Sequence, residues 1–300
     1  MLKLNGLHLL LTYQCTFECD HCFVWGSPWQ TGTMTIETIR NILTQAKEAG
    51  SVETIFFEGG EPFLYYQTML AGINAAIELG FNVGIVTNSY WATSEEDARL
   101  WLSPLVGKVE GLTISSDLYH FSEKVSTQSK YVTCVAEQLN IPVGIICIEK
   151  PEEQAASTIG QIPASPASVM FRGRAAEKLA SKSSLSPSVT FASCPHENLT
   201  DPGRVHIDAL GNMHICQGIS IGNLQTSSIK EICEAYDPPT HPIIGALLAG
   251  GPYQLLKQYH LPDKIMYADA CHLCYEARKE LRQQFPDILC PDQMYGVSIN

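Results

Sequence analysis

The sequence contains little positive charge. Its 300 residues include 19 Lys and Arg against 31 Asp and Glu, which gives a formal net charge of −12, and it has no run of basic residues. Nucleic acids and acidic membrane surfaces are bound by basic faces of proteins. We therefore expect no nucleic-acid partner and no membrane partner.

Long apolar runs are also missing. No segment approaches the roughly 18 consecutive apolar residues that a membrane-spanning helix needs. The N-terminal stretch MLKLNGLHLLLTYQC has no small-residue cleavage site, which favours a buried strand over a signal peptide. We expect a cytoplasmic protein, and thiols stay reduced in that compartment. The 11 cysteines therefore indicate metal or cluster ligation rather than a disulfide framework.

The first part of the chain alternates between strand-like and helix-like patterns. The expected strands are 7–11, 54–58, 83–87, 112–116, 143–148 and 168–171, and the expected helices are 35–49, 66–79, 94–101 and 123–139. This alternation predicts a parallel sheet covered by helices. Six strands indicate an α/β fold, a partial (β/α)6 barrel of the TIM type that stays open on one side. The fifth connection, 150–167, is the least regular.

The composition changes after these strands. The expected segments are a linker at 181–193, a hairpin at 204–216 with its turn at Leu210-Gly211-Asn212, and helices at 228–236 and 270–285. Most of the remaining cysteines lie in this part of the chain. We predict a barrel domain over residues 1–180 and a smaller cysteine-rich extension over residues 181–300.

Three cysteines follow the first apolar run, in the segment LTYQCTFECDHCF: Cys15, Cys19 and Cys22. A structural zinc site normally has four protein ligands, whereas a [4Fe–4S] cluster held by three thiolates keeps one iron open for an external ligand. The spacing C-x3-C-x2-C lets one loop wrap three corners of such a cluster, at the end of a barrel where chemistry is usually placed. From these residues alone, two alternatives stay open: a zinc site completed by His21 or a distant residue, and three unrelated thiols.

The second expected strand ends in the segment FFEGGEP (56–62). Its double glycine, Gly59-Gly60, permits a close backbone approach, and Glu61 offers a carboxylate. In this order, the cysteine triplet and the GGEP segment resemble the signature of the radical S-adenosylmethionine (SAM) superfamily, over roughly residues 7–175. The resemblance implies reductive cleavage of SAM to a 5′-deoxyadenosyl radical, which takes a hydrogen atom from a substrate carbon.

The resemblance also assigns roles to individual residues. The three loop cysteines are expected to hold the cluster, and its open iron would bind the amino and carboxylate groups of SAM. The expected cofactor-contacting residues are Gly59, Gly60, Glu61, Thr87, Asn88, Ser115, Ser116, Asp117 and Arg174. For the residues at strand ends, an ordinary turn role is the alternative, and for Arg174 it is a surface ion pair with Glu177. Trp25 and Trp29 are expected to shield the cluster from solvent.

A second group of cysteines lies in the extension: Cys194, Cys216, Cys271 and Cys274. Cys216 completes the pattern G-x4-C from Gly211, and the last two form a CxxC at the start of the final helix. This arrangement resembles the SPASM extension, or its shorter form called twitch, and implies an auxiliary [4Fe–4S] cluster with four protein ligands. A structural zinc site made by the same thiolates is the alternative.

Three further residues are candidates for the chemistry itself. Tyr119 and His120 follow Asp117 at the expected barrel mouth, and Cys147 lies near the end of the fifth strand. Plain surface roles for the first two, and a buried small hydrophobic thiol for Cys147, are the alternatives. The other cysteines are expected to be core thiols or a spare ligand: Cys134, Cys233 and Cys290.

We predict an oxidative reaction on a small molecule of the carbohydrate type, with the auxiliary cluster assisting and a ferredoxin or flavodoxin as reductant. The first cluster cysteine lies at position 15, without space before it for a leader-binding domain, which favours a small molecule over a peptide. Modification of a ribosomal peptide or protein side chain and activation of a glycyl-radical enzyme are the enzymatic alternatives. An iron–sulfur electron carrier is the non-enzymatic one, but it would have no use for the GGEP segment.

Overall fold

The structure is a computed structural model that describes residues 1–152 and 166–297. Among these residues, nine strands form one sheet in the order β10-β9-β8-β1-β2-β3-β4-β5-β6, and two short strands, β11 and β7, pair separately. The strands are β1 Gly6–Leu10, β2 Thr54–Glu58, β3 Asn82–Thr87, β4 Gly111–Ser115, β5 Val143–Ile148, β6 Pro166–Ala167, β7 Ser186–Pro187, β8 Arg204–Ile207, β9 Asn212–Cys216, β10 Ile219–Asn223 and β11 Met266–Tyr267.

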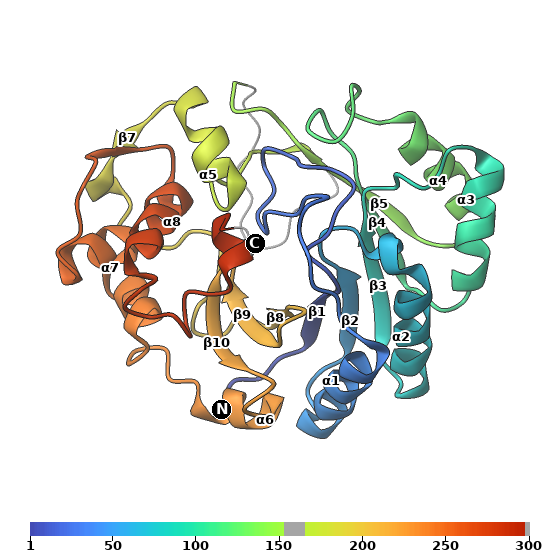
Figure 1. Ribbon diagram of the computed structural model, residues 1–300, viewed down its shortest axis with the longest axis horizontal. Helices are drawn as coiled ribbons and strands as arrows, with labels where there is room; N and C mark the ends of the chain where they lie inside the picture. The colour runs from blue at the N-terminus through green and yellow to red at the C-terminus, as the bar shows by residue number, and fades with distance from the viewer. Residues whose placement is uncertain (153–165, 298–300) are drawn as a thin grey trace.

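Helices cover one face of this sheet. The α-helices are α1 Ile36–Ala49, α2 Tyr66–Glu78, α3 Glu95–Leu102, α4 Thr127–Gln138, α5 Arg174–Lys178, α6 Ile229–Ala235, α7 Pro242–Gln258 and α8 Ala270–Leu281. The short 3-10 helices are η1 Pro62–Tyr65, η2 Ser103–Leu105, η3 Ala180–Lys182, η4 Ser188–Thr190 and η5 Asp292–Tyr295. Helices α1 to α4 lie on the outer side of strands β1 to β5, as expected for a partial (β/α)6 barrel (Figure 1).

Buried and partly buried residues alternate along two strands of the barrel. In β2 and β4 every second residue is fully buried under the helices, and the residues between them are only partly buried. Because successive side chains of a strand point to opposite faces, these partly buried residues face the inside of the curved sheet. The pairings from β1 to β6 are all parallel, so the carboxyl ends of these strands share one edge.

The predicted helix starts are confirmed at two sites. The Thr35 side chain accepts a hydrogen bond from the Thr38 amide, and Ser94 accepts one from the Asp97 amide. These side chains satisfy amide donors that have no partner within the helix. The fourth helix was expected from 123 but begins at Thr127, because the cap is Ser126.

One prediction for the middle of the chain is wrong. The sixth strand is the two-residue β6 rather than 168–171, and residues 168–171 have no regular structure. One cause is that the amide of Phe171 donates to the Asp269 carboxylate at 3.2 Å instead of to a neighbouring strand. Most of the irregular fifth connection lies outside the described residues.

Sequence analysis missed the longest helix, α7. It contains Gly250, Gly251 and Pro252, which predict a break, and the backbone of both glycines is indeed non-helical. The helix is therefore two segments joined by a kink. The final helix ends at Leu281 rather than 285, and the expected linker contains β7 and η4.

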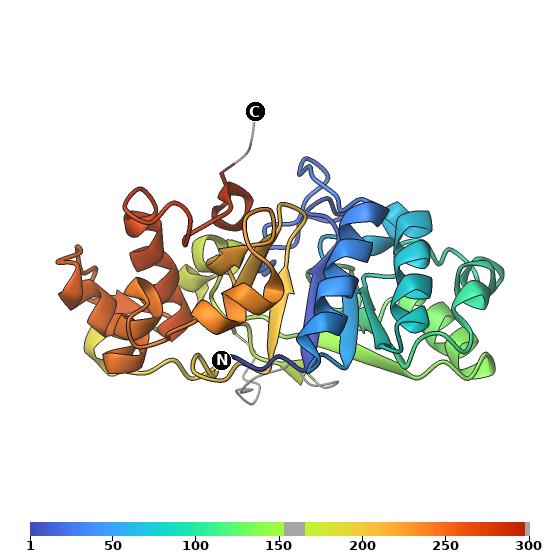
Figure 2. The ribbon, with the colours of Figure 1, turned by 90° about the horizontal axis from the view of Figure 1, so that it is seen from below.

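The C-terminal part continues the barrel sheet. Strand β8 pairs in parallel with β1, and β9 and β10 follow antiparallel, with the hairpin turn at Gly211 (φ +85°) as predicted. A second hydrophobic core lies under this part, around α7 and α8. Figure 2 shows the C-terminal helices in orange and red at one end of the molecule and the green α3–α4 region at the other.

The described residues contain no helix that combines the length and the apolar character needed to cross a membrane.

The packing of the main core predicts how much the truncation of one buried side chain destabilises the protein. Phe57 on β2 is fully buried among the helices, whereas Leu100 on α3 is 68% exposed. We expect Phe57→Ala to lower the free energy of unfolding by about 3–5 kcal/mol, and Leu100→Ala to change it by no more than about 0.5 kcal/mol. Urea unfolding followed by circular dichroism measures both. Equal effects of the two substitutions would contradict this placement of the core.

Candidate active site

The loop after β1 carries the three cysteines that the sequence singled out. Cys15 and Cys19 are buried and Cys22 is half-buried. Backbone amides point at two of the sulfurs: Gly26 donates to Cys22 Sγ at 3.2 Å, and Phe17 donates to Cys15 Sγ at 3.5 Å. Such donors stabilise thiolates and are typical of sulfurs that hold iron–sulfur clusters.

Burial alone makes these thiols unfavourable as free anions. It raises the pKa of Cys15 to about 12, with Glu61 and Cys22 adding to the increase, and it raises the pKa of Cys19 further. A buried thiolate at neutral pH therefore needs a metal or another cation as a partner. The loop fits a cationic metal group.

The distances between the sulfurs distinguish a site for a single metal ion from a site for a larger cluster. In a zinc tetrahedron with Zn–S bonds of about 2.3 Å, the sulfurs lie about 3.8 Å apart. Within the described part of the chain, three groups of ligand atoms have all members within 4.8 Å of one another, and Cys271 is the only cysteine in any of them. The three loop sulfurs do not form such a close group, which favours a larger inorganic cluster over a single zinc ion.

His21, the alternative fourth zinc ligand, does not join the cysteines. Its ring stacks on Tyr119 with centroids 4.5 Å apart, and its Nε2 lies 3.6 Å from the Asp117 carboxylate. Burial lowers the pKa of His21 to about 4, so the ring is neutral at physiological pH. The structure groups His21 with Asp117 and His120 instead.

Arg174 forms hydrogen bonds with the backbone of the cysteine loop. It is almost fully buried, and its guanidinium donates to the carbonyl oxygens of Cys19 at 2.7 Å and Gly26 at 2.9 Å. The side chain also lies over the Trp25 ring, with 5.1 Å to its centroid. The alternative of a surface ion pair with Glu177 is therefore wrong, and in the structure Arg174 contacts the loop backbone.

The double glycine after β2 packs against the same loop. The Gly60 amide donates to the Thr12 carbonyl at 2.6 Å, and the Glu61 amide donates to the Gln14 carbonyl at 2.9 Å. A Cβ on Gly60 would lie 2.1 Å from the Gln14 oxygen. The glycines therefore allow the two backbones to touch, in addition to any ligand that approaches them.

Glu61 does not line the pocket and has a structural role instead. Its carboxylate is fully buried and accepts hydrogen bonds from Thr87 Oγ1 at 2.8 Å, the Asn88 amide at 2.7 Å and the Phe63 amide at 3.1 Å. Burial raises the pKa of Glu61 to about 7, although these donors oppose the shift. The carboxylate ties the end of β2 to the end of β3.

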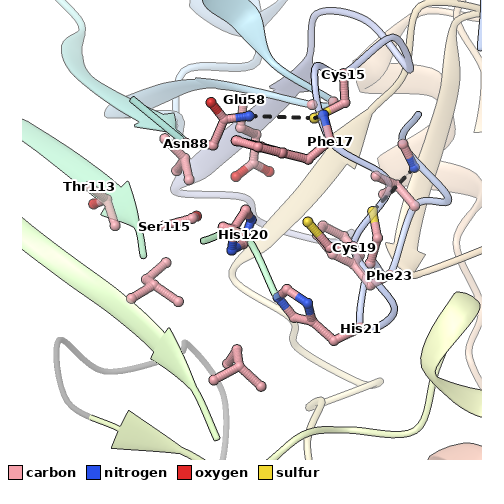
Figure 3. Close-up of a pocket in the computed structure, with 18 of the residues that line it drawn as sticks. Cys15, Phe17, Cys19, His21, Phe23, Glu58, Asn88, Thr113, Ser115 and His120 are labelled. Atoms are coloured by element: carbon pink, nitrogen blue, oxygen red, sulfur yellow. Dashed lines mark hydrogen bonds between the residues drawn. The ribbon is translucent and has the colours of Figure 1, made fainter. Parts of the chain in front are cut away.

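A pocket of about 320 Å³ opens between the cysteine loop and the ends of the strands. Figure 3 shows Cys15, Cys19 and His21 on the loop side, facing Thr113 and Ser115 on the opposite side. The predicted site residues that line it are Cys15, Cys19, Cys22, Gly59, Gly60, Thr87, Asn88, Ser115 and His120. The Asn88 side-chain amide lies 3.5 Å from Cys15 Sγ and so joins the strand end to the loop.

Other predicted residues lie outside this lining. Ser116 is buried and its hydroxyl accepts a hydrogen bond from the Ser126 amide at 2.9 Å, next to the α4 cap. Tyr119 stacks on His21 behind the pocket wall. The neighbours of Cys147 on β5, Ile146 and Ile148, line the pocket while Cys147 does not. Because side chains alternate along a strand, Cys147 points away from the pocket, and its burial favours the alternative of a small hydrophobic thiol.

Asp117 organises the end of β4. Its carboxylate accepts hydrogen bonds from the Tyr119 amide at 2.9 Å, from His120 Nδ1 at 2.8 Å and from the Ile148 amide at 3.2 Å. Burial on its own would raise the pKa of Asp117, but the hydrogen bond from His120 and the electrostatic interactions with the His21 and His120 rings lower it to about 2. Asp117 therefore stays ionised and fixes His120 at the pocket edge.

The four cysteines of the C-terminal part converge, as the sequence predicted. Cys194, Cys216, Cys271 and Cys274 all line one small cavity, together with Arg172 and Arg278. Burial raises the pKa of each of these four thiols. Their sulfurs also form no close single-ion group among the described residues. The donor set and its two guanidinium groups suit an anionic cluster.

Sequence analysis missed several residues of the main pocket: His8, Glu58, Arg172, Arg204 and His206. Each lies on or beside a strand, within an otherwise apolar or alternating run. The alternation of side chains along each strand could have identified three of them, because His8, Glu58 and His206 occupy positions that face the inside of the sheet.

Comparisons with known proteins identify the N-terminal part. Residues 9–106 match the radical SAM superfamily. Over 111 residues the chain is 30% identical to a putative peptide biosynthesis protein, YydG, of Bacillus subtilis (37% of this chain, 35% of the relative). It is also 30% identical over 111 residues to an S-adenosylmethionine-dependent nucleotide dehydratase of Selenomonas ruminantium (37% and 38%). These matches span little more than a third of each relative.

Solved structures share the fold over more of the chain. Streptococcus suis SuiB, bound to its precursor peptide SuiA, matches with a TM-score of 0.59 at 13% identity, covering 90% of this chain and 76% of SuiB. BtrN, in complex with AdoMet and 2-DOIA, matches with a TM-score of 0.51 at 14% identity, covering 79% and 85%. At these identities the likeness concerns the fold alone.

The contact between the double glycine and the loop generates a prediction. We expect Gly60→Ala to destabilise the protein by about 1–3 kcal/mol, because the new methyl group would overlap the Gln14 carbonyl. Gly111→Ala is the matched control, since nothing lies within 4 Å of a Cβ built at that position. Urea unfolding of the metal-free variants measures both effects. Equal stability of the two variants would contradict the packing described here.

Proposed function

We propose that the chain is an enzyme of the radical SAM type, which cleaves SAM reductively and removes a hydrogen atom from a substrate carbon in an oxidative reaction. The proposal is carried by the cysteine loop, whose three separated thiols line the same pocket as the double glycine. When bound, the cluster and SAM supply a 5′-deoxyadenosyl radical. The chain must bind both, orient the substrate and exclude water.

We assign the three loop thiolates, Cys15, Cys19 and Cys22, to a [4Fe–4S] cluster with one open iron. The amides that point at Cys15 and Cys22 would stabilise its sulfurs. Arg174 fixes the loop carbonyls and so holds the cysteines in position. Its buried positive charge would also offset part of the negative charge of a thiolate-bound cluster.

SAM would lie between the loop and the strand ends. Of the predicted contacts, the backbone of Gly59 and Gly60 and the side chains of Thr87, Asn88 and Ser115 line the pocket. Glu61 would act indirectly, since its carboxylate positions Thr87 and Asn88. Ser116 and Asp117 would likewise support the wall rather than touch the cofactor.

We assign the second group of cysteines to an auxiliary [4Fe–4S] cluster in a twitch-like extension over residues 181–300. Four thiolates leave no iron open, so its role would be electron transfer rather than substrate binding. Arg172 lines both the main pocket and the small cavity. The auxiliary site is therefore next to the pocket, and a cluster held there would be able to accept an electron.

The substrate is proposed to be a small molecule of the carbohydrate type that loses two electrons in total. Modification of a peptide is the second candidate, and the name of the Bacillus relative and the peptide-bound SuiB structure favour it. A ferredoxin or flavodoxin of the cytoplasm would supply the first electron. A simple electron carrier has no need of a pocket of about 320 Å³ beside its cluster.

Cofactor cleavage tests the radical SAM assignment. The cluster-loaded protein, reduced with dithionite without oxygen, is expected to convert SAM to 5′-deoxyadenosine, which liquid chromatography with mass spectrometry detects. Cys19→Ala should lower this product at least about 100-fold, because a cluster ligand is lost. Cys134→Ala, a change on the half-buried surface of α4, should leave it unchanged. A wild-type protein that carries both clusters and forms no 5′-deoxyadenosine would sink the proposal.

Iron content tests the auxiliary cluster separately. Two [4Fe–4S] clusters predict about eight irons per chain in the reconstituted protein. Replacing the three loop cysteines with Ala should leave about four irons, because the second site is independent of the loop. Replacing Cys194, Cys216, Cys271 and Cys274 should also leave about four. Full loss of iron and labile sulfide from the loop variant would refute the second site.

A further inference from the structure

Two histidines and a glutamate meet inside the barrel, on the pocket side of the sheet. His8 Nδ1 lies 3.1 Å from Glu58 Oε1, and His206 Nε2 lies 3.0 Å from the same oxygen. One ligand atom from each residue falls within 4.8 Å of the others. All three residues line the main pocket, and Figure 3 shows Glu58 on its wall.

The sheet register brings the three side chains together. His8 on β1 and His206 on β8 are direct partners in a parallel pair. On the other side of β1, His8 pairs with Phe56, and Glu58 follows two residues later on the same face of β2. Segments about 200 residues apart in the sequence therefore place two imidazoles and one carboxylate next to one another.

Neighbouring rings hold the histidines in place. Phe56 stacks on His8 with centroids 4.7 Å apart and an interplanar angle of 16°. Phe23, from the cysteine loop, lies edge-on to His206 at 5.9 Å. Rigid donors lose little entropy when they bind a metal, so this support favours a preformed site.

The charges also suit a cation. Burial lowers the pKa of His206. For Glu58, burial alone would raise the pKa, but the two histidines lower it below its usual range. A neutral imidazole and an ionised carboxylate are the forms that bind metals, so a bound cation would take the place of the protons that the histidines share with Glu58. Arg204, whose charge acts on His206, is paired with Glu197 at 3.4 Å.

The geometry points to a mononuclear divalent metal site formed by His8, Glu58 and His206. Two imidazole nitrogens and a carboxylate oxygen are a typical donor set for zinc or another first-row divalent ion. Ligands about 2.0–2.2 Å from zinc lie about 3.4 Å apart in a tetrahedron, so the observed 3.0 and 3.1 Å need an expansion of only a few tenths of an ångström.

Because all three residues line the pocket, an ion held by them would be accessible from it. An ion there would bind an oxygen of the substrate, such as a hydroxyl, carboxylate or carbonyl group, and hold it near the cysteine loop. This role rests on the proposed function, whereas binding of the metal does not. The site differs from both cysteine groups, because it uses nitrogen and oxygen donors from β1, β2 and β8.

The two other close groups of ligands are weaker candidates. In the group of His21, Asp117 and His120, the carboxylate already accepts three backbone hydrogen bonds, from Tyr119, His120 and Ile148. In the group that contains Cys271, the carboxylate of Asp269 caps α8 and also binds the Phe171 amide.

Cobalt binding tests the site directly. Cobalt(II) substitutes for zinc and is distinguishable from cluster iron by elemental analysis. The cluster-loaded, oxidised protein is treated with a chelator, incubated with Co²⁺ without SAM, and freed of unbound metal. Mass spectrometry of the metals and the low-temperature electron paramagnetic resonance signal of high-spin Co²⁺ are then recorded. We expect about one tightly bound cobalt per chain.

Matched variants locate the bound cobalt. His8→Gln and His206→Gln should each weaken cobalt binding at least about 100-fold, and Glu58→Gln should do the same, while the iron content stays at the wild-type value. His260→Gln is the control, because this histidine is exposed just after α7 and does not line the pocket. Wild-type protein that binds no cobalt, or His8→Gln and His206→Gln variants that bind it as tightly as wild type, would overturn the proposal.

The result of the cobalt-binding experiment does not depend on catalytic turnover. Failure to bind cobalt would leave the formation of 5′-deoxyadenosine unaffected, and failure to cleave SAM would leave cobalt binding unaffected. The two proposals are therefore tested independently.

Discussion

The contact between the backbone after β2 and the cysteine loop is the constraint on which the site depends. The amides of Gly60 and Glu61 donate to the carbonyls of Thr12 and Gln14, and only glycine leaves room for this approach. Arg174 secures the far side of the loop through two further carbonyls. A loop with few regular hydrogen bonds of its own is thereby held rigid enough to present three thiols at fixed positions.

Further contacts connect this part of the site to the neighbouring strands of the sheet. The buried Glu61 carboxylate joins the end of β2 to Thr87 and Asn88 at the end of β3. On its other side, β1 pairs with β8, and β8 pairs with β9, which ends at Cys216. One cysteine of the second group therefore belongs to the same sheet as the loop, and Arg172 lines the cavities of both groups.

Much of this could be predicted from the sequence, because the signals are local. The spacing of Cys15, Cys19 and Cys22, the double glycine and the alternating strands each depend on a few adjacent residues. The bounds of the sixth strand were wrong, since the contact of Phe171 with Asp269 is a tertiary property. The sequence also did not show that Cys147 points away from the pocket. The group of His8, Glu58 and His206 was missed for the same reason: the pairing of β1 with β8 is invisible in the sequence.

The central claim is that the loop cluster keeps one iron open for SAM. Its most direct test is electron paramagnetic resonance of the reduced protein in which Cys194, Cys216, Cys271 and Cys274 are replaced, so that only the loop cluster contributes. The account predicts a [4Fe–4S]⁺ signal whose g-values shift when SAM is added, because the cofactor binds the open iron. A signal from a fully loaded cluster that saturating SAM leaves unchanged would contradict it.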